Sequence, residues 1–546
     1  MDAPKTIPRL LMRAAEAWPE QVAVVSEDGA RTLSYRELWR AVQRTAAALM
    51  AAGIAPRDRV ALWAPNSVDW IVFALGITSC GATLVPINTR FKAAEAGYVL
   101  EKSRTKLLCT VSEFLGTRYF EQLRAEYGGA TATRPIAGLP DLERVVLLGA
   151  AGPQALDAFL AEAALLPTAA LQARLDGVSE AHISDIMFTS GTTGRPKGVC
   201  TTHQQNVRAY SAWAHAVGLT KQDRYLIVSP FFHAFGYKAG ILACLITGAT
   251  MLPHSVFDPG QVLARLKRER ISVLPGPPTL YQSLLAHPEL QATALPKLRL
   301  AVTGAAVVPV ELIERMQREL GFETVITGYG LTESCGIATM CRAGDSAQII
   351  ANTSGRAIEG VEVHVVDATG KRLLAGEPGE VVIRGYNVMQ GYFEAPDATR
   401  EAVDAEGFLH TGDIGTLDVA GNLRITDRLK DMYITGGFNC YPAEIERSLS
   451  AHPGIAQIAV IGVPDERLGE VGMAFIVARE GHFSDGPDMW QPALHAFCRE
   501  RLANFKVPRH FAIVAALPQS AAGKVLKTQL RAGAAQVVQQ AHAAHK

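Results

Sequence analysis

Apolar residues form two kinds of pattern along the first hundred residues, helical spacing and short continuous runs. Residues 34–53 carry apolar side chains at helical spacing and finish at Gly53, a residue that suits the end of a helix. Residues 60–63 and 82–87 are short apolar runs typical of buried strands, and residues 69–75 between them predict a helix. Strands that alternate with helices predict crossover units and therefore a parallel sheet.

The alternation continues through the middle of the chain. Residues 202–216 predict a helix, and residues 225–229, 273–278 and 298–306 predict further strands. From residue 353 the pattern changes to short period-two segments separated by glycines, which predicts a small antiparallel barrel or distorted sheet attached to the parallel core.

A second domain is expected near the C-terminus. Strands are predicted at residues 458–463, 474–478 and 511–514, and Pro442 suits the first turn of a helix. The charged segment LRITDRLKD is interpreted as a linker. We therefore predict an α/β fold with a large N-terminal domain of helix-flanked parallel sheets and a small barrel at residues 1–427, followed by a small α/β domain at residues 428–546.

Composition and charge narrow the class of protein. The chain has 546 residues, of which 48% are hydrophobic and 19% charged, as in soluble globular proteins of more than one domain. Lysine plus arginine and aspartate plus glutamate both number 53, so no nucleic-acid or membrane-surface partner is indicated.

Cysteine usage and apolar runs bear on location. The eight cysteines are scattered without a C-x-x-C pair, which argues against a zinc site or a disulfide framework. The first residues lack the apolar stretch of a signal peptide, and glycines and a proline interrupt residues 71–87, which are interpreted as a buried helix and strand. A cytoplasmic protein with no transmembrane segment is expected.

The stretch DIMFTSGTTGRPKGV is the strongest candidate for binding chemistry. Small hydroxyl residues and glycines let backbone N–H groups converge on an anion, and a lysine adds positive charge. It is not a P-loop, because Arg195 and Pro196 separate the lysine from the preceding glycine. The alternative is an exposed strand-to-helix loop that is rich in turn formers. The residues of this predicted polyphosphate cradle are Thr189, Ser190, Gly191, Thr192, Thr193, Gly194 and Lys197.

Two further stretches carry groups suited to a nucleotide. In TGYGLTES, Tyr329 offers a flat face for a purine, Thr332 a hydroxyl for phosphate, and Glu333 a hard oxygen ligand for Mg²⁺. In HTGD, Asp413 is an acceptor that could bind two hydroxyls, or it could simply bond its own backbone in a turn.

In combination these motifs resemble the adenylate-forming superfamily, which comprises acyl-CoA synthetases, aryl-CoA ligases, luciferases and peptide-synthetase adenylation domains. The resemblance runs from SYRELW to GKVLK and so covers nearly the whole chain. It implies ATP and Mg²⁺ as cofactors, coenzyme A as a substrate, an acyl-adenylate intermediate, and a small domain that rotates between two half-reactions.

The resemblance also implies roles for single residues. Phe232 and His233 would line the acyl pocket, Asp413 would bind the ribose hydroxyls, and Lys430 would be the hinge. Lys524 would be the adenylation lysine, catalytic together with Thr332, Glu333 and His233. The remaining binding positions implied are Gly304, Ala305, Ala306, Gly328, Tyr329 and Gly330 beside the adenine or acyl group, Arg428 at the ribose or phosphate, and Gly436 and Gly437 at the pantetheine channel.

The acid substrate is suggested by two pocket segments. PFFHAFGYKAGILACLITGAT and VLPGPPTLYQSLL resemble bacterial ligases that activate the propionate side chain of the methylhexahydroindanedione fragment left after steroid ring cleavage. Medium-chain fatty or aryl acids are the nearer alternative. A charged amino acid is disfavoured because these segments offer few charges, Lys238 being the exception.

Two alternatives of another class are considered. An adenylating enzyme that loads a carrier protein would need a phosphopantetheine protein, and an inactive nucleotide-binding protein should lack a charged motif residue. Lys197, Glu333, Asp413, Arg428 and Lys524 are all present, which favours an active CoA ligase. A homodimer remains open.

Overall fold

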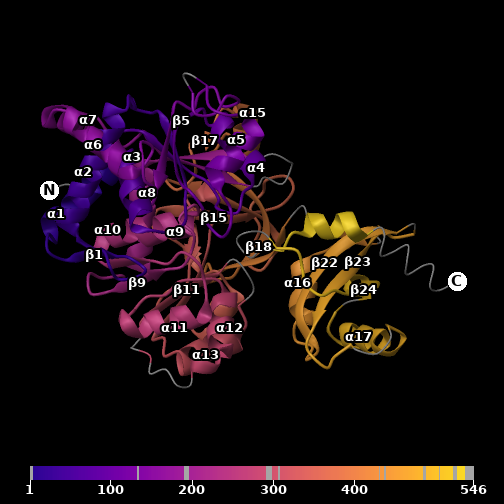
Figure 1. Ribbon diagram of the computed structural model, residues 1–546. Helices are drawn as coiled ribbons and strands as arrows, with labels where there is room; N and C mark the ends of the chain where they lie inside the picture. Colours follow the sequence, from indigo (N-terminus) through magenta and orange to yellow (C-terminus); the bar gives the residue numbers. More distant parts are fainter. Residues whose placement is uncertain are drawn as a thin grey trace. The chain divides into compact units, whose positions relative to one another are not determined.

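A computed structural model describes most of the chain. The described residues are 4–534 apart from 132–133, 190–195, 291–294, 296–297, 305–307, 429–430, 436–437, 466, 484–486, 503 and 520–524. The chain divides into two compact units, one formed by residues 1–304, 308–363 and 383–409 and the other by residues 305–307, 364–382 and 410–546. Figure 1 follows the chain through both units.

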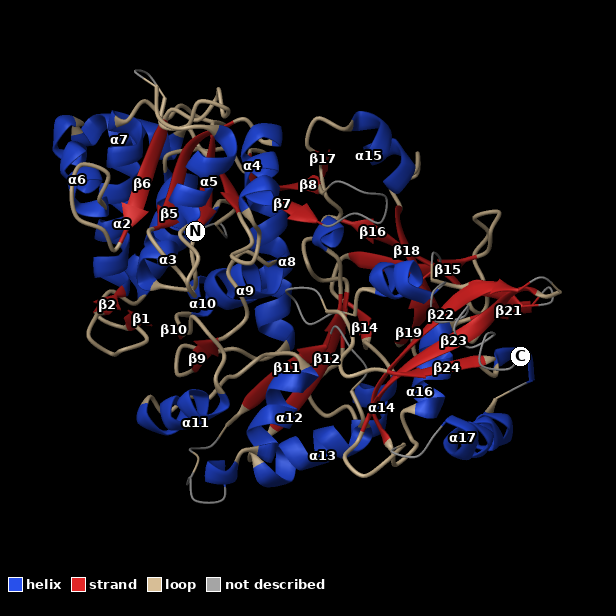
Figure 2. Cartoon of the chain, turned by 45° about the vertical axis from the view of Figure 1, so that its right-hand side comes forward, coloured by secondary structure: helices blue, strands red, loops and turns tan. Residues whose placement is uncertain are grey.

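The first unit is built around a seven-stranded sheet in the order β17-β8-β7-β4-β3-β5-β6. Strands β4, β3, β5 and β6 are parallel, as is the pairing of β4 with β7, whereas β7, β8 and β17 pair antiparallel. The predicted parallel sheet is therefore confirmed, with an antiparallel edge (Figure 2). The strands are β3 (Arg59–Trp63), β4 (Thr83–Pro86), β5 (Thr105–Val111), β6 (Arg144–Leu148), β7 (Ile183–Thr189), β8 (Lys197–Thr202) and β17 (Gly391–Tyr392).

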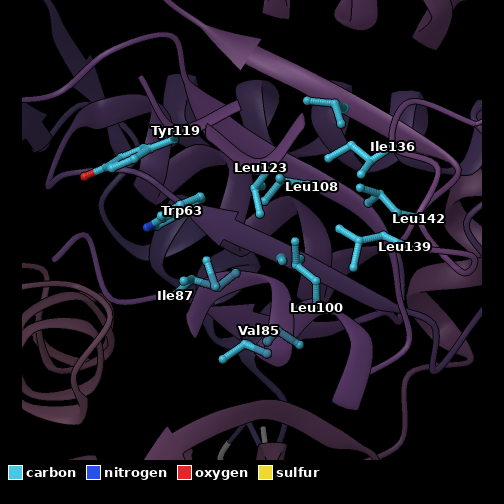
Figure 3. Close-up of a cluster of buried hydrophobic side chains, with 14 of the residues drawn as sticks. Trp63, Val85, Ile87, Leu100, Leu108, Tyr119, Leu123, Ile136, Leu139 and Leu142 are labelled. Atoms are coloured by element: carbon cyan, nitrogen blue, oxygen red, sulfur yellow. The ribbon is translucent and has the colours of Figure 1, made fainter. Parts of the chain in front are cut away.

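Apolar side chains cover both faces of this sheet. In β3, Ala61 and Trp63 belong to one hydrophobic cluster, which is drawn in Figure 3. Val60 and Leu62, which alternate with them and so point to the other face, are equally buried. The ring of Trp63 stacks on Tyr119 with centroids 4.2 Å apart. Burial on both faces is typical of strands in a parallel sheet and explains their continuous apolar runs.

The helices of the first unit confirm the predicted helical segments. Helix α2 (Tyr35–Ala51) begins with a capping box in which Ser34 and Glu37 bond each other's backbone N–H. Helix α3 (Val68–Ser79) is buried along nearly its whole length and leads into β4, as expected for residues 71–87. The other helices of eight or more residues are α1 (Ile7–Ala17), α4 (Ala93–Lys102), α5 (Tyr119–Tyr127), α7 (Thr168–Asp176), α8 (His203–Ala216), α11 (Pro259–Arg268), α12 (Pro278–Ala286) and α13 (Val310–Glu319).

Shorter helical segments complete this unit. A continuous helical stretch runs through α9 (Ala234–Gly236), a π-helical segment (Tyr237–Leu242) and α10 (Ala243–Thr247). The remaining short segments are α6 (Leu156–Ala161), α14 (Ala347–Asn352), α15 (Pro396–Ala402) and the 3₁₀ turns Glu162–Leu165, Pro288–Leu290 and Thr332–Ser334.

Two further sheets lie in the first unit. One has the order β2-β1-β10-β9 and the other β11-β12-β13-β14. Their strands are β1 (Val22–Val25), β2 (Thr32–Ser34), β9 (Arg224–Ile227), β10 (Thr250–Pro253), β11 (Leu300–Gly304), β12 (Thr324–Tyr329), β13 (Thr339–Met340) and β14 (Arg356–Ala357).

The strand predicted at residues 273–278 is not formed as a continuous strand. Val273 bridges Tyr225 and Leu300, and the backbone N–H groups of Leu274 and Gly276 donate to Leu300 and Val302 of β11, both at 3.0 Å. Pro275, Pro277 and Pro278 remove the backbone donors that a longer strand would need, and α12 starts at the last of them.

The glycine-punctuated segments after residue 353 form a four-stranded sheet in the order β15-β16-β18-β19, in agreement with the predicted distorted sheet. Its strands are β15 (Val361–Val366), β16 (Gly379–Gly385), β18 (Leu409–Leu417) and β19 (Leu423–Arg428). The segment interpreted as a linker is therefore a strand as far as Arg428.

The C-terminal α/β part of the second unit confirms the three predicted strands. Its sheet has the order β21-β20-β23-β22, with β24 on β23. The elements are β20 (Tyr433–Thr435), β21 (Phe438–Cys440), α16 (Pro442–Leu449), β22 (Ile455–Asp465), β23 (Gly469–Ala478), α17 (Pro487–Arg501), the 3₁₀ turn Asn504–Lys506 and β24 (His510–Ile513). Ile445, Val460 and Leu494 share its core.

The described helices are short or polar relative to a membrane span. None of them is by itself long and apolar enough to cross a bilayer. One pair, Leu156–Leu165 with Thr168–Asp176, meets the length and composition test together but bends by 97° at its break.

Candidate active site

The predicted polyphosphate cradle connects two antiparallel strands. Thr189 at the end of β7 lies opposite Lys197 at the start of β8, so the two ends of the loop are held together. The loop is thus a strand-to-strand connection rather than the strand-to-helix loop considered from the sequence, and α8 begins only after β8. Ser190, Gly191, Thr192, Thr193 and Gly194 lie outside the described residues.

Close packing between β7 and β8 requires a glycine at position 198, directly after Lys197. A Cβ on Gly198 would lie 2.7 Å from Cγ2 of Ile186 and 3.1 Å from the ring of Phe188. A larger residue would therefore push β8 away from β7, and Lys197 would move with it.

The TGYGLTES segment runs from strand β12 into a 3₁₀ turn. Gly328 pairs with Gly304 of β11 on one side and with Met340 of β13 on the other. Tyr329, Thr332 and Glu333 are all partly exposed, so their side chains are accessible to a ligand. Ala305 and Ala306, which follow β11, lie outside the described residues.

Gly330 fixes the path of this turn. A Cβ at this position would lie 2.4 Å from the backbone nitrogen of Ile337, closer than side chains can approach. The chain returns past Gly330 because Cys335 and Gly336 adopt positive φ angles of 55° and 90°. These close approaches set the position of Thr332 and Glu333.

A tyrosine that the sequence did not single out joins the two motifs. The hydroxyl of Tyr392 in β17 donates to Oε1 of Glu333 at 3.0 Å. Nζ of Lys197 lies 5.0 Å from the centre of the same ring, within the range of a cation–π interaction. Glu333 and Lys197 lie 136 positions apart in the sequence. Both nevertheless contact the side chain of Tyr392.

The environment of Tyr392 keeps its hydroxyl protonated. Partial burial raises the pKa of Tyr392 well above its ordinary value, and the charge of Glu333 and the hydrogen bond to it raise this pKa further. Tyr392 is therefore a hydrogen-bond donor to Glu333 throughout the neutral range.

The predicted acyl-pocket residues lie at the start of the helical stretch that begins with α9. Phe232 is buried, and its ring centroid lies 4.5 Å from that of His233. Burial, with a smaller contribution from the positive charge of Arg90, lowers the pKa of His233 to about 4. His233 is therefore neutral near pH 7, and its Nε2 has no hydrogen-bond partner within the described part of the chain.

Lys238 does not present a charge to a pocket. Its ammonium is fully buried and pairs with Oδ1 of the equally buried Asp185 at 2.9 Å. It also donates to Oγ1 of Thr201 at 3.0 Å. The side chain of Lys238, whose orientation the sequence left open, therefore points to Asp185 of β7 and Thr201 of β8 and forms an internal ion pair.

The ribose candidates belong to the second unit. Asp413 in β18 is buried and lies opposite Arg428 of β19 in the strand register. The adjoining Gly412 is held by its backbone N–H, which donates to Glu380 at 3.0 Å. Among the other predicted site residues, Lys430, Gly436, Gly437 and Lys524 lie outside the described residues.

A metal site built from protein ligands alone is absent from the described ranges. No group of three or more His, Cys, Asp or Glu side chains comes together there to hold an ion. Glu333 is a single carboxylate with one oxygen bonded to Tyr392, which suits Mg²⁺ held mostly by phosphate oxygens and water.

Comparison with known proteins assigns the class. The family model described as "AMP-binding enzyme" matches residues 11–393, and the model described as "AMP-binding enzyme C-terminal domain" matches residues 444–524. The chain therefore belongs to the AMP-binding enzyme family, and the resemblance to adenylate-forming enzymes is confirmed.

Within this family, two curated relatives are highly similar to the chain. Both carry the name 3-[(3aS,4S,7aS)-7a-methyl-1,5-dioxo-octahydro-1H-inden-4-yl]propanoyl:CoA ligase. The protein of Rhodococcus jostii strain RHA1 is 48% identical over 534 residues, covering 97% of this chain and 99% of its own length. The protein of Mycobacterium tuberculosis is 49% identical over 528 residues, covering 96% of this chain and 98% of its own length.

Solved structures agree on the fold. The anthranilate CoA ligase AuaEII in complex with anthranoyl-AMP superposes with a TM-score of 0.84 at 27% identity, covering 97% of this chain and 98% of that one. ATP-bound MatB from Rhodopseudomonas palustris has a TM-score of 0.80 at 28% identity, covering 96% and 98% of the two chains. The α/β architecture is thus shared with a CoA ligase that holds an acyl-adenylate and with an ATP-bound relative.

Proposed function

We propose that the protein is an AMP-forming acid:CoA ligase. In the first half-reaction an oxygen of the substrate carboxylate attacks the α-phosphorus of ATP, the bond to the β-phosphate breaks, and pyrophosphate leaves. In the second half-reaction the thiolate of coenzyme A attacks the acyl carbon, and AMP leaves with the electrons of the broken acyl–oxygen bond. The observation that carries this proposal is the meeting of Lys197 and Glu333 on Tyr392 in a chain of the AMP-binding family.

The chemistry explains the need for these groups. An anionic carboxylate must approach the polyanionic triphosphate, so the barrier is largely electrostatic and fixed cations and N–H donors lower it. Lys197 and the loop from Thr189 to Gly194 would bind the phosphates, with Thr332 beside them. Lys524 would then compensate the charge that develops during adenylation.

The remaining positions would hold the nucleotide, the acyl group and the thiol. Asp413 would accept hydrogen bonds from the ribose hydroxyls, and Tyr329 would stack on the adenine. The other positions assigned in this way are Gly304, Ala305, Ala306, Gly328 and Gly330 for the adenine or acyl group, Arg428 for the ribose or phosphate, and Gly436 and Gly437 for the pantetheine arm.

Mg²⁺ would be held through Glu333. A bound Mg²⁺ supplies positive charge that neutralises phosphate oxygens. One oxygen of Glu333 accepts from Tyr392, which orients the carboxylate.

We propose the indanedione propionate named for the two relatives as the acid. Identities of 48% and 49% over nearly the whole chain support this choice. A bulky, apolar diketone also suits walls formed by Phe232 and a neutral His233. The charge of Lys238 is neutralised by its ion pair with Asp185. Medium-chain and aryl acids are the alternatives, because relatives at 36% and 32% identity are named feruloyl-CoA synthase (Amycolatopsis) and medium-chain acyl-CoA ligase (Macaca fascicularis).

The test is acid-dependent ATP–pyrophosphate exchange with a panel of indane, aryl and medium-chain acids. The indanedione propionate is expected to give the highest kcat/KM, and adding coenzyme A should release AMP and form the thioester. A higher kcat/KM for an aryl or fatty acid would refute the substrate. Exchange that never leads to a CoA thioester would favour an enzyme that loads a carrier protein, and absence of exchange with every acid would favour an inactive nucleotide-binding protein.

We also propose that residues 428–546 form a lid that turns about Lys430. Proline at this position fixes φ and removes the backbone N–H, so it should block a rotation. Lys430→Pro is expected to retain adenylation and to lose thioester formation in single-turnover assays. Equal losses in both half-reactions would reject the hinge.

A further inference from the structure

Tyr392 is anchored to the strand that follows the phosphate loop. Its strand β17 pairs antiparallel with β8, with Tyr392 opposite Val199. On either side of this pair, the backbone N–H of Gln390 donates to Cys200 at 3.0 Å and that of Phe393 donates to Gly198 at 2.7 Å. The backbone at Tyr392 therefore keeps a fixed register with β8, which begins at Lys197.

The same segment is anchored to the turn that carries Glu333. The backbone N–H of Met389 donates to the carbonyl oxygen of Glu333 at 2.8 Å. The side chain of Asn387 donates to the carbonyl oxygen of Ile337 at 2.7 Å. Residues 387–393 thus connect two motifs that lie far apart in the sequence.

The side chain of Tyr392 lies between two opposite charges. Its hydroxyl bonds Glu333, and its ring faces the ammonium of Lys197. Lys197 and Glu333 are both described, and they make no ion pair with each other. A direct pair would occupy the lysine that the phosphates need and the carboxylate that the cation needs.

We propose that Tyr392 is a positioning residue that keeps Glu333 and Lys197 apart and oriented for metal-bound triphosphate. This inference rests on the proposed function, since it assumes that Glu333 receives Mg²⁺ and Lys197 receives phosphate. Partners that orient a metal ligand typically change metal affinity by about 10-fold to 100-fold when they are removed.

The effect is measured by binding rather than turnover. ATP is titrated without the acid substrate, once with Mg²⁺ and once with EDTA, and each titration gives a dissociation constant. The dissociation constant in EDTA divided by that in Mg²⁺ is a ratio that reports how far Mg²⁺ strengthens ATP binding. Tyr392→Phe keeps the ring beside Lys197 and removes the bond to Glu333. We expect it to lower this ratio by about tenfold and to leave ATP affinity in EDTA unchanged.

A tyrosine just before residues 387–393 provides the control. The hydroxyl of Tyr386 is buried without a hydrogen-bond partner in the described part of the chain, and its ring faces Arg208 at 3.9 Å. Tyr386→Phe should therefore leave the ratio at the wild-type value. In a Glu333→Gln background, Tyr392→Phe should change the ratio no further.

A further variant keeps the test decisive if Tyr392→Phe does not fold. The backbone N–H of Tyr392 donates to Oγ1 of Thr399 at 2.9 Å, and Thr399→Val removes this anchor without changing the tyrosine. It should lower the ratio in the same direction. An unchanged ratio in the folded variants, or equal weakening with and without Mg²⁺, would overturn the inference. A wild-type protein that never binds ATP would instead refute the proposed function.

Discussion

The buried ion pair between Lys238 and Asp185 of β7 makes a quantitative prediction about stability. Nζ of Lys238 lies 2.9 Å from Oδ1 of Asp185, and both side chains have no exposed surface. Lys238→Met keeps an unbranched side chain that is one heavy atom shorter and removes the charged ammonium. The carboxylate of Asp185 then loses the cation that compensates its burial.

The remaining contacts set the expected size of the loss. Removing one partner of a buried pair costs about 3–5 kcal/mol. Asp185 keeps hydrogen bonds from Thr201 and Ser184, each at 2.8 Å, and from Asn206 at 2.5 Å. Because these donors still stabilise the carboxylate, we expect a loss near the lower end, about 3 kcal/mol of the free energy of unfolding.

Urea denaturation followed by tryptophan fluorescence suits this measurement. Five of the six tryptophans lie in the unit that holds the pair, and only Trp490 lies in the other. Lys5→Met is the matched control, because Lys5 also pairs with a carboxylate, Glu180, at 3.2 Å, but its side chain is 58% exposed. This variant should lose less than about 1 kcal/mol of the free energy of unfolding.

A neutral pair should recover much of the loss. Combining Lys238→Met with Asp185→Asn removes both charges and keeps a side chain of the same shape beside Ser184 and Thr201. A single variant that loses less than about 1 kcal/mol would refute the reasoning, and so would a double variant less stable than Lys238→Met.

Two other variants test the site and the pH dependence. Gly330→Ala should lower the rate of pyrophosphate exchange by about 100-fold, because its Cβ would displace the backbone at Ile337. Gly533 has open space around it, so Gly533→Ala should exchange at the wild-type rate. Equal rates for the two variants would contradict this account. Burial lowers the pKa of His203 from 6.5 to about 3, so between these values only the unfolded chain binds the proton and stability falls as pH falls. His203 should account for about 2 kcal/mol of the stability lost from pH 7 to pH 5 in urea unfolding. His203→Asn should therefore lose about 2 kcal/mol less than the wild type over this pH range, and an equal loss in the two proteins would contradict the assignment.

Much of the fold was predictable because its elements carry local signals. Helix α2 has a capping box at its start and Gly53 after its end, and the strands of the parallel sheet are continuous apolar runs. The strand predicted at residues 273–278 was too long because the prediction gave more weight to hydrophobicity than to the three prolines. Strand β8 was not predicted, since its polar and small residues resemble a loop.

Residues of the candidate site could be predicted only where a motif is contiguous. Thr189, Lys197 and Glu333 stand in strings of unusual composition, whereas Tyr392 belongs to a strand of two residues with no periodic pattern. Its contacts with Glu333 and Lys197 depend on the pairing of β17 with β8, which no local pattern indicates. The pairing of Lys238 with Asp185 likewise depends on tertiary packing.

The central claim is that this chain joins a carboxylic acid to coenzyme A through an acyl-adenylate. The most direct measurement is mass spectrometry of a reaction that contains the purified protein, MgATP, coenzyme A and the indanedione propionate. The account predicts that the CoA thioester and AMP accumulate in equal amounts, and that omitting the acid abolishes both. Formation of ADP in place of AMP, or no thioester from this acid or from any other acid of the panel, would contradict it.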